Sequence, residues 1–492
     1  MTSLEILQKY FGYTHFRVGQ QKIIESVLQN RDTLAVLPTG AGKSLCYQVP
    51  GLVFEGTTIV ISPLISLMKD QVEKLENHGI SAIFLNTSID ESELQKRLIA
   101  LQLGKVKFVY VAPERLLLHH FVLACQQTPI SLLVVDEAHC ISQWGHDFRP
   151  SYHQISHFIN SFSKRPPIIA VTATATTLVR KDIATQLQMR APNIFQQSCR
   201  RTNLFFAVCA YTHAYQQQLD LFRIIKNHKN ESGIIYCSTR QRVQNVTTTL
   251  QHFEQSCGMY HAGMTVEQRE EVQTNFLTNK TKIIAATNAF GLGIDKQDVR
   301  FVIHYNVPLS LESYYQEAGR AGRDGKPARC YLFFFEKDLE ALQELSHHSH
   351  SAKKRLEHII RYATHHQCRV MQQMRHFDEW VDFRSCGQCD HCLKSFLQVD
   401  EKEKNIIQKL CALRKNSADF QFLSDQAIKQ LAVHQPQTPT QFLAIPGIGK
   451  GWWSQWQKAM QKYSEITAAQ LGTTRHHKTH ADGSTHAFQL LK

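Results

Sequence analysis

The stretch TLAVLPTGAGKS, residues 33–44, decides the fold class of this chain. Residues 33–37 have the length and composition of a buried strand, and a glycine-rich turn and a helical pattern follow them. Glycines let the backbone wrap a phosphate, and a helix N-terminus directs its N–H groups at it. Lys43 would reach the terminal phosphates and Ser44 would hold Mg²⁺, so the stretch predicts a nucleotide site. The full pattern has glycine where this chain has Leu37.

Short apolar runs alternate with helical patterns up to about residue 340. The candidate strands form two series, residues 33–37, 58–61, 106–111, 132–135 and 168–172, then residues 233–237, 259–261, 282–286, 301–305 and 330–335. This alternation predicts an α/β fold with parallel sheets, whose ligands bind at the carboxyl ends of the strands. We predict two tandem domains, residues 1–198 and 199–339.

Composition narrows the possible classes of protein. The chain has 492 residues, of which 43% are hydrophobic, so a mainly disordered state is excluded. No run approaches the ~20 apolar residues of a membrane span. Residues 1–5 contain neither a basic nor an apolar signal region, so we do not expect secretion. Thirteen mostly scattered cysteines indicate a reducing compartment. The net charge of +13 favours a polyanionic partner.

Two further segments supply charges that phosphoryl transfer needs. Asp136 and Glu137 follow the candidate strand 132–135; Asp136 would hold Mg²⁺ through water, and Glu137 would position the attacking water. Arg320 and Arg323 lie three residues apart on one helix face and would reach the γ-phosphate when the domains close. A surface helix held by salt bridges is the alternative for the arginines.

The ordered set of motifs resembles that of superfamily 2 helicases and, more narrowly, the RecQ family of DNA helicases. The motifs are residues 42–44, 61–64, 136–139, 172–176, 235–238, 286–295 and 316–323. The resemblance implies two RecA-like domains that use ATP and Mg²⁺ to move 3′ to 5′ on single-stranded DNA and to unwind duplexes in repair or recombination. It also implies catalytic roles for Lys43, Asp136, Glu137, Gln316, Arg320 and Arg323, and nucleotide contacts by Thr39, Gly40, Gly42, Lys43, Ser44, Gly293 and Asp295.

Residues 11–20 resemble the adenine-recognition motif of the RecQ family. By this resemblance, Gln20 pairs with the base edge while Tyr13 and Arg17 cover the base. An amide offers a donor and an acceptor together, so we expect ATP to be preferred over GTP. The alternative is an N-terminal helix that only covers the sheet.

Residues 142–150 resemble the aromatic-rich loop that links bound DNA to ATP hydrolysis in the same family. Aromatic side chains can stack on bases, and the polar ones can bind phosphates. The predicted DNA-binding residues are Ser142, Gln143, Trp144, His146, Phe148 and Arg149. Packing of these aromatic residues in the core is the alternative.

A cysteine cluster lies beyond the second α/β domain. Cys386, Cys389 and Cys392 stand at two-residue gaps, with Cys368 upstream. Four thiolates suit a structural, tetrahedral Zn²⁺, and the spacing resembles the zinc-binding subdomain of the RecQ family, here residues 340–397. An iron–sulfur cluster is the alternative. His391 and His376 are expected not to bind the metal.

The C-terminal part departs from the family pattern. Many RecQ proteins carry a winged-helix domain after the zinc site, but here only residues 393–400 precede a small helical unit. That unit, residues 400–466, resembles the HRDC-like all-α domain of RecQ helicases and ribonuclease D, and its glycine turn at residues 446–450 could meet a phosphate. DNA binding, protein contact and a purely structural role stay open for this domain. Residues 467–492 are expected to be disordered.

Several functions and partners remain open on the sequence alone. Without a winged-helix pin, the chain could be a DNA-stimulated translocase that unwinds little. An RNA-directed helicase and a non-catalytic scaffold are further alternatives. We expect single-stranded and forked duplex DNA as partners, with a single-strand-binding protein or other repair proteins, no membrane, and a monomer. We also expect a compact bacterial protein that is cytoplasmic and associated with the nucleoid.

Overall fold

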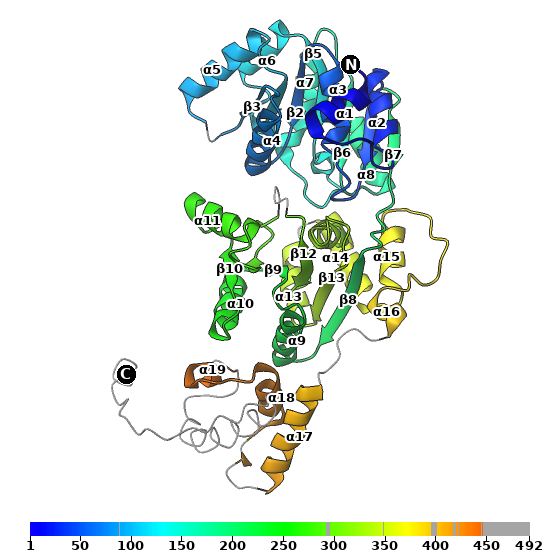
Figure 1. The fold of residues 1–492 in the computed structure, drawn as a ribbon. Coiled ribbons are helices and arrows are strands. Elements are labelled where there is room, and N and C mark those ends of the chain that lie inside the picture. Colours follow the sequence, from blue (N-terminus) through cyan, green and yellow to red (C-terminus); the bar gives the residue numbers. More distant parts are fainter. Residues whose placement is uncertain are drawn as a thin grey trace. The chain divides into compact units, whose positions relative to one another are not determined.

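The computed structural model describes residues 1–87, 89–291, 296–347, 349–394, 401–416, 420–421, 423–443 and 445. These residues form two compact units (Figure 1). The larger unit comprises residues 1–217, 227–251 and 255–396, and the smaller unit comprises residues 218–226, 252–254 and the described residues after 396.

The first sheet of the larger unit is parallel and has the strand order β3-β4-β2-β5-β6-β1-β7. Its strands are β1 (Thr33–Val36), β2 (Thr57–Ile61), β3 (Ala82–Leu85), β4 (Phe108–Val111), β5 (Ile130–Val135), β6 (Ile168–Thr172) and β7 (Asn193–Gln196). Successive strand residues face opposite sides of a sheet. Leu34 and Ala35 accordingly enter two separate cores.

Helices cover both faces of this sheet. The face of Ala35 packs against α2 (Gln20–Leu28), α3 (Leu45–Val53) and α4 (Ile65–Asn77). The face of Leu34 packs against α5 (Glu91–Gln102), α6 (His119–Gln127), α7 (Gln154–Asn160) and α8 (Thr177–Gln186). The N-terminal helix α1 (Ser3–Phe11) packs beside α2 and α3. A sheet buried on both faces explains why its strands lack a polar alternation.

The second sheet is also parallel, with the strand order β10-β11-β9-β12-β13-β8. Its strands are β8 (Leu204–Tyr211), β9 (Ser232–Tyr236), β10 (Cys257–Tyr260), β11 (Ile283–Ala286), β12 (Val299–His304) and β13 (Ala328–Phe335). The connecting helices are α9 (Ala214–Asn227), α10 (Arg240–His252), α11 (Val266–Leu277) and α12 (Leu311–Ala318). The two predicted parallel sheets are therefore confirmed.

Three strands were missing from the sequence prediction. β3 and β7 are the edge strands of the first sheet; two residues of β3 are half-buried, and those of β7 alternate between half-buried and exposed. β8 is long and mostly buried, but it directly follows the segment that we expected to join the two domains. All ten predicted strands are present, with ends that differ by one or two residues in most cases.

The cysteine-bearing subdomain packs on the second sheet through α13 (Asp338–Ser346), α14 (His350–Thr364), α15 (Arg369–His376) and α16 (Asp390–Leu393). Phe206 of β8 forms a parallel bridge with Cys389. The N–H of Val208 donates to the Asp390 carboxylate over 3.0 Å, and Asp390 forms a buried ion pair with Arg369 at 2.9 Å. These bonds hold the cysteine loop against β8.

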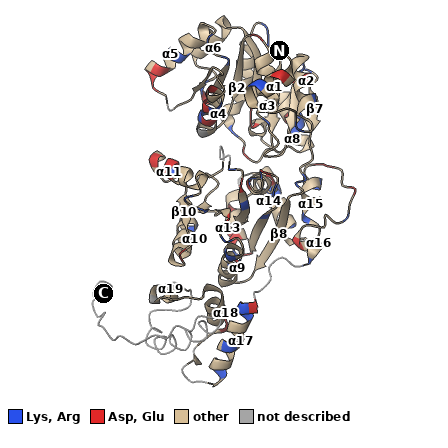
Figure 2. Ribbon diagram, in the orientation of Figure 1, with Lys and Arg blue, Asp and Glu red and all other residues tan. Residues whose placement is uncertain are grey.

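The described part of the smaller unit is helical, as predicted. Its helices are α17 (Glu401–Asn416), α18 (Asp425–His434) and α19 (Pro439–Leu443), around a core that includes Ile406, Leu410, Leu431 and Phe442. The glycine turn at 446–450 and the tail 467–492 lie outside the described residues. Acidic residues occupy the first turns of α5 and α11, which are red in Figure 2. None of the described helices is long and apolar enough to cross a membrane.

Candidate nucleotide site and nucleic-acid interface

The glycine-rich turn leaves the carboxyl end of β1 as predicted. The N–H of Leu37 donates to the Thr172 carbonyl over 3.0 Å, which extends the pairing with β6. Gly40 and Gly42 adopt φ of 85° and 82°, a conformation that glycine tolerates without a steric cost. A Cβ on Gly42 would lie 2.5 Å from Nε2 of Gln20. Glycine is therefore required for both the turn and its close packing.

The two acidic residues follow β5, which β6 separates from β1, and they line the same cavity as the turn. Burial and the neighbouring charge of Glu137 raise the pKa of Asp136 to about 7, while the Lys43 ammonium acts in the opposite direction. Glu137 takes a left-handed φ of 45°, a conformation that costs of order 1–3 kcal/mol. Its N–H donates to Asp136 Oδ1 over 2.9 Å. A buried carboxylate with a raised pKa beside a lysine is typical of a functional site.

A cavity of about 1030 Å³ brings the predicted nucleotide residues of both sheets together. Its lining includes Thr39, Gly40, Gly42, Lys43, Ser44, Asp136 and Glu137 from the first domain and Gln316, Arg320 and Arg323 from the second. Arg320 is buried beside Gly291, where an added Cβ would meet its Nη2 at 2.7 Å. The Cγ of Arg323 would lie 3.6 Å from a Cβ on Gly40. Gly293 and Asp295 lie outside the described residues.

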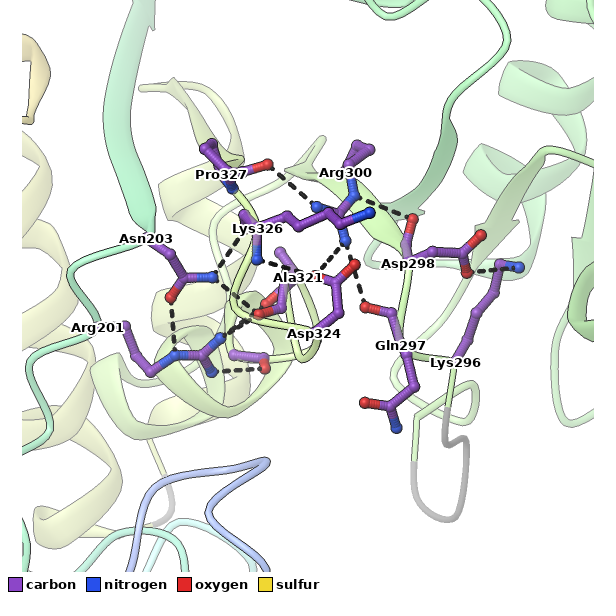
Figure 3. Close-up of polar contacts among 12 residues, drawn as sticks. Arg201, Asn203, Lys296, Gln297, Asp298, Arg300, Ala321, Asp324, Lys326 and Pro327 are labelled. Atoms are coloured by element: carbon purple, nitrogen blue, oxygen red, sulfur yellow. Dashed lines mark hydrogen bonds and ion pairs between the residues drawn. The ribbon is translucent and has the colours of Figure 1, made fainter. Parts of the chain in front are cut away.

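Arg201 is a residue that the sequence prediction missed. Its guanidinium donates to the carbonyls of Thr39 (3.2 Å), Gly319 (3.4 Å), Ala321 (3.2 Å) and Gly322 (2.8 Å). Figure 3 shows this guanidinium between Asn203, which accepts from Nε over 3.2 Å, and the turn that carries Ala321. One side chain thus joins the glycine-rich turn to the segment of the two arginines. The only sequence signal was a basic pair, residues 200–201, at the joint between the domains.

The predicted adenine motif lies at one end of the cavity, where Tyr13, Arg17 and Gln20 are all lining residues. The Gln20 amide is buried and already bonded. Its Nε2 donates to the carbonyls of Ala41 and Gly42 over 3.1 and 3.0 Å, and its Oε1 accepts from the N–H of Arg17 over 2.8 Å. Arg17 also donates to the Gly40 carbonyl over 2.5 Å. The motif is therefore coupled to the glycine-rich turn.

The predicted DNA-binding loop divides into exposed and structural residues. Trp144 is 49% exposed, and Gln143 is exposed, whereas Ser142 is fully buried and donates to Asp182 of α8 over 2.6 Å. The half-buried Phe148 packs edge-on against His153 with centroids 5.5 Å apart. Arg149 pairs with Asp147 at 3.0 Å and donates to the Pro63 carbonyl over 3.0 Å. The Ser142 hydroxyl and the Arg149 guanidinium thus already have partners within the fold.

A chain of contacts runs from this loop to the acidic pair. The rings of His146 and His139 stack with centroids 4.3 Å apart. His139 Nδ1 lies 2.8 Å from the Thr172 hydroxyl and 3.4 Å from Glu137 Oε2. Burial lowers the pKa of His139, which keeps its imidazole neutral. A displacement of the loop can therefore reach Glu137 through two rings.

The four predicted cysteines form one cluster. The sulfur atoms of Cys368, Cys386, Cys389 and Cys392 all lie within 4.8 Å of one another, and those of Cys386 and Cys392 are 3.9 Å apart. Tetrahedral zinc with ~2.3 Å Zn–S bonds requires sulfur separations of roughly 3.8 Å, so this donor set fits Zn²⁺. His391 and His376 are outside the cluster, and His376 lies 2.8 Å from Glu312.

The fold and the cleft define a class. The structure is similar to that of Mss116p bound to single-stranded RNA and AMP-PNP, with a TM-score of 0.60, 15% identity and coverage of 95% of this chain and 94% of the other. At that identity the likeness shows the fold alone. The chain also matches the families described as DEAD/DEAH box helicase (residues 17–182) and helicase conserved C-terminal domain (residues 216–325). The class is thus that of two-domain helicases.

The narrower family follows from the cysteine subdomain and from whole-chain similarity. Residues 332–393 match the family described as RecQ zinc-binding. The chain is 42% identical over 416 residues to the ATP-dependent DNA helicase RecQ of Bacillus subtilis, covering 83% of this chain and 70% of that relative. It is 38% identical over 463 residues to RecQ of Pasteurella multocida, covering 91% and 71%. The chain belongs to the RecQ family of ATP-dependent DNA helicases, as its motifs indicated, and its subdomain binds zinc.

Proposed function

We propose that this chain unwinds DNA by hydrolysing ATP with Mg²⁺ in the cavity between its two sheets, and that each cycle moves it 3′ to 5′ along a single strand. One observation carries the proposal. The cavity is lined at once by Lys43 and Glu137 of the first sheet and by Gln316, Arg320 and Arg323 of the second. If hydrolysis needs residues from both sheets, its rate depends on how one sheet moves relative to the other.

The phosphate chemistry follows from the residues on each wall. Lys43 would bind the terminal phosphates, and Glu137 would orient the attacking water. Ser44 and Asp136 would hold Mg²⁺, which neutralises phosphate charge when it is bound. Arg320 and Arg323 would stabilise the charge that develops on the γ-phosphate. The hydrogen bonds of Arg201 to both segments support their alignment across the cavity.

Recognition of adenine would require the Gln20 amide to exchange hydrogen-bond partners. In the structure the Gln20 amide is bonded to the carbonyls of Ala41 and Gly42. Pairing with adenine would require that amide to release one or both carbonyls. Binding of the correct base would therefore free the glycine-rich turn to close on the phosphates, with Tyr13 and Arg17 covering the base.

The aromatic-rich loop would sense the strand. A base stacked on the exposed Trp144 would shift the loop, and the stacked rings of His146 and His139 would carry that shift to Glu137. Gln143, Phe148 and Arg149 would support the strand from the same loop. The buried Ser142 would act by anchoring the loop to α8.

The finer expectations belong to the same proposal. We expect action on single-stranded and forked DNA as a monomer, with a single-strand-binding protein or other repair proteins at the nucleoid. The four-cysteine site would hold the subdomain together, since a short loop has little core of its own.

The experiment is a paired measurement of ATP hydrolysis and strand displacement on a duplex with a 3′ tail. We expect single-stranded DNA to stimulate hydrolysis at least tenfold more than single-stranded RNA, and unwinding to require the 3′ tail. Hydrolysis without displacement would favour a translocase. Stimulation of hydrolysis by RNA alone, or a hydrolysis rate that neither DNA nor RNA changes, would contradict the proposal.

A further inference from the structure

The loop that joins α15 to α16, residues 377–389, carries an unusually exposed tryptophan. Trp380 is 88% exposed, more than any other large apolar side chain that the structure describes. In Figure 1 this loop extends in yellow between the labels α15 and α16. Indole is costly to leave in water, and a solvent-facing tryptophan on an ordered support is typical of a binding surface.

The base of the loop is fixed to the first domain and to the connection between the domains. Asp378 accepts from the N–H of Thr177 over 2.7 Å. Glu379 accepts from the Ser198 hydroxyl over 2.7 Å and from the N–H of Cys199 over 2.6 Å. The carboxylates on the two residues before Trp380 are thus occupied, and they fix the chain from which the indole projects.

The same helix supports the tryptophan loop and the aromatic-rich loop. Thr177 is the first residue of α8, and Asp182 of α8 accepts the hydrogen bond from Ser142. Five residues of α-helix span about 7.5 Å. The anchor of Trp380 therefore lies within about two helical turns of the anchor of Trp144, and a strand held at one loop can continue to the other.

The surroundings of Trp380 offer positive charge. The Arg200 guanidinium lies over the Phe383 ring at 4.6 Å, and both Arg200 and Arg384 are exposed. Neither arginine has an ion-pair partner among the described residues. Asp382 is the one exposed acid of the loop whose carboxylate makes no bond within the described chain. An aromatic face beside two arginines suits a nucleic acid strand, which presents bases and phosphates together.

We propose that Trp380, with Arg200 and Arg384, forms a second DNA-stacking site that receives a base where the duplex opens. This rests on the proposed function, because it assigns a part to the unwinding reaction. Residues 393–400 leave no room for a winged-helix domain before the next helical unit, so another side chain must stack at the opening pair. Trp380 supplies that contact, and the two arginines hold the flanking phosphates.

The test uses full-length zinc-loaded protein and a 3′-tailed duplex with 2-aminopurine at successive positions around the junction. We expect the wild type to quench the probe at the junction. We expect W380A to lose that quenching and to unwind at least fivefold more slowly per ATP hydrolysed, and W380F to keep more than half of both. L345A, which truncates a 69% exposed leucine of α13, is the matched control and should behave as the wild type.

Each outcome decides a separate point. Unchanged quenching and unwinding in W380A would overturn the stacking site, and would leave the exposed indole as a surface for a protein partner. Equal loss in W380A and W380F would overturn stacking as its basis. If W380A loses zinc, the R200A and R384A variants test the proposal instead. Each should lower the slope of log DNA affinity against log salt concentration by about one. Unchanged slopes would overturn the proposal. Failure of the wild type to unwind would instead contradict the proposed function.

Discussion

The two sheets share one strand order but carry different chemistry. Read from one edge, β3-β4-β2-β5-β6-β1 of the first sheet corresponds to β10-β11-β9-β12-β13-β8 of the second. Residues 37–44 follow β1 and form the glycine-rich turn, whereas only residues 212–213 separate β8 from α9. Asp136 and Glu137 follow β5, and Tyr305 and Asn306 follow β12. The second sheet keeps the topology without a phosphate site.

This difference separates what the fold does from what the loops do. The first sheet holds the residues that we assign to the phosphates, and Gln316 of α12 lines the cavity from the second. Arg320 and Arg323 lie in the turn after α12, so the prediction that they share a helix face was wrong: the helix ends at Ala318. A cavity built from two unlike walls can be completed or opened by a small movement of one wall. The first two substitutions below contrast a residue of the first sheet with a residue of the second, and the next two predictions concern the cavity between them.

The largest contrast is expected between the two strand-to-helix loops. K43A removes the charge that we assign to the terminal phosphates, so we expect ATP hydrolysis to fall by about 10³-fold while affinity for single-stranded DNA stays within about threefold. H213A changes the equivalent loop of the second sheet and should alter hydrolysis by less than twofold. A comparable loss of ATP hydrolysis in both variants, measured by phosphate release, would contradict the claim that only the first sheet carries a phosphate-binding loop.

A second contrast concerns carboxylates at strand ends. E137Q keeps the shape of the residue assigned to the attacking water, and we expect hydrolysis to fall by about 10²-fold while binding of a fluorescent ATP analogue persists. E336Q changes an exposed carboxylate at the end of β13 and should have little effect. Hydrolysis that survives in E137Q would remove Glu137 from the mechanism.

Arg201 tests the connection between the walls. R201A loses bonds to Thr39 and Gly322, and we expect kcat to fall by about tenfold with little change in KM for ATP, because the chemical groups remain but are misaligned. R201K keeps the charge without the planar fork and should recover only part of the rate. Full activity in R201A would show that the walls align without it.

The smallest effect is a pH dependence. Since burial and Glu137 raise the pKa of Asp136 to about 7, protons compete with Mg²⁺ for this carboxylate below that pH. The Mg²⁺ concentration for half-maximal hydrolysis should rise up to about tenfold per pH unit below 7 and be nearly constant above 8. A requirement that does not change between pH 6 and 8 would contradict the binding of Mg²⁺ by Asp136.

The fold was largely predictable because its strands are apolar runs that end in polar motifs. The runs at 132–135 and 168–172 match β5 and β6 to within two residues. The missed strands β3, β7 and β8 all lie at sheet edges, and β3 and β7 carry half-buried or exposed residues where a central strand is fully buried. Strand order depends on contacts between distant segments, which local patterns do not encode.

The site was predictable where a residue type has one chemical use. Lys43 and Asp136 line the cavity and the four cysteines form one cluster, while the chemical roles of Lys43 and Asp136 stay predictions. Arg201 could not be found in this way because its partners are backbone carbonyls, which no residue pattern records. The burial of Ser142 likewise depends on Asp182, forty residues further along the chain.

The central claim is that the second sheet acts on the nucleotide in the transition state. Single-turnover hydrolysis by R323A, measured beside equilibrium binding of a fluorescent ATP analogue, tests it most directly. We predict that the rate falls by at least 10²-fold while the Kd changes less than threefold, because the arginine stabilises charge that develops only during transfer. A rate equal to that of the wild type, or a loss of affinity as large as the loss of rate, would contradict the account.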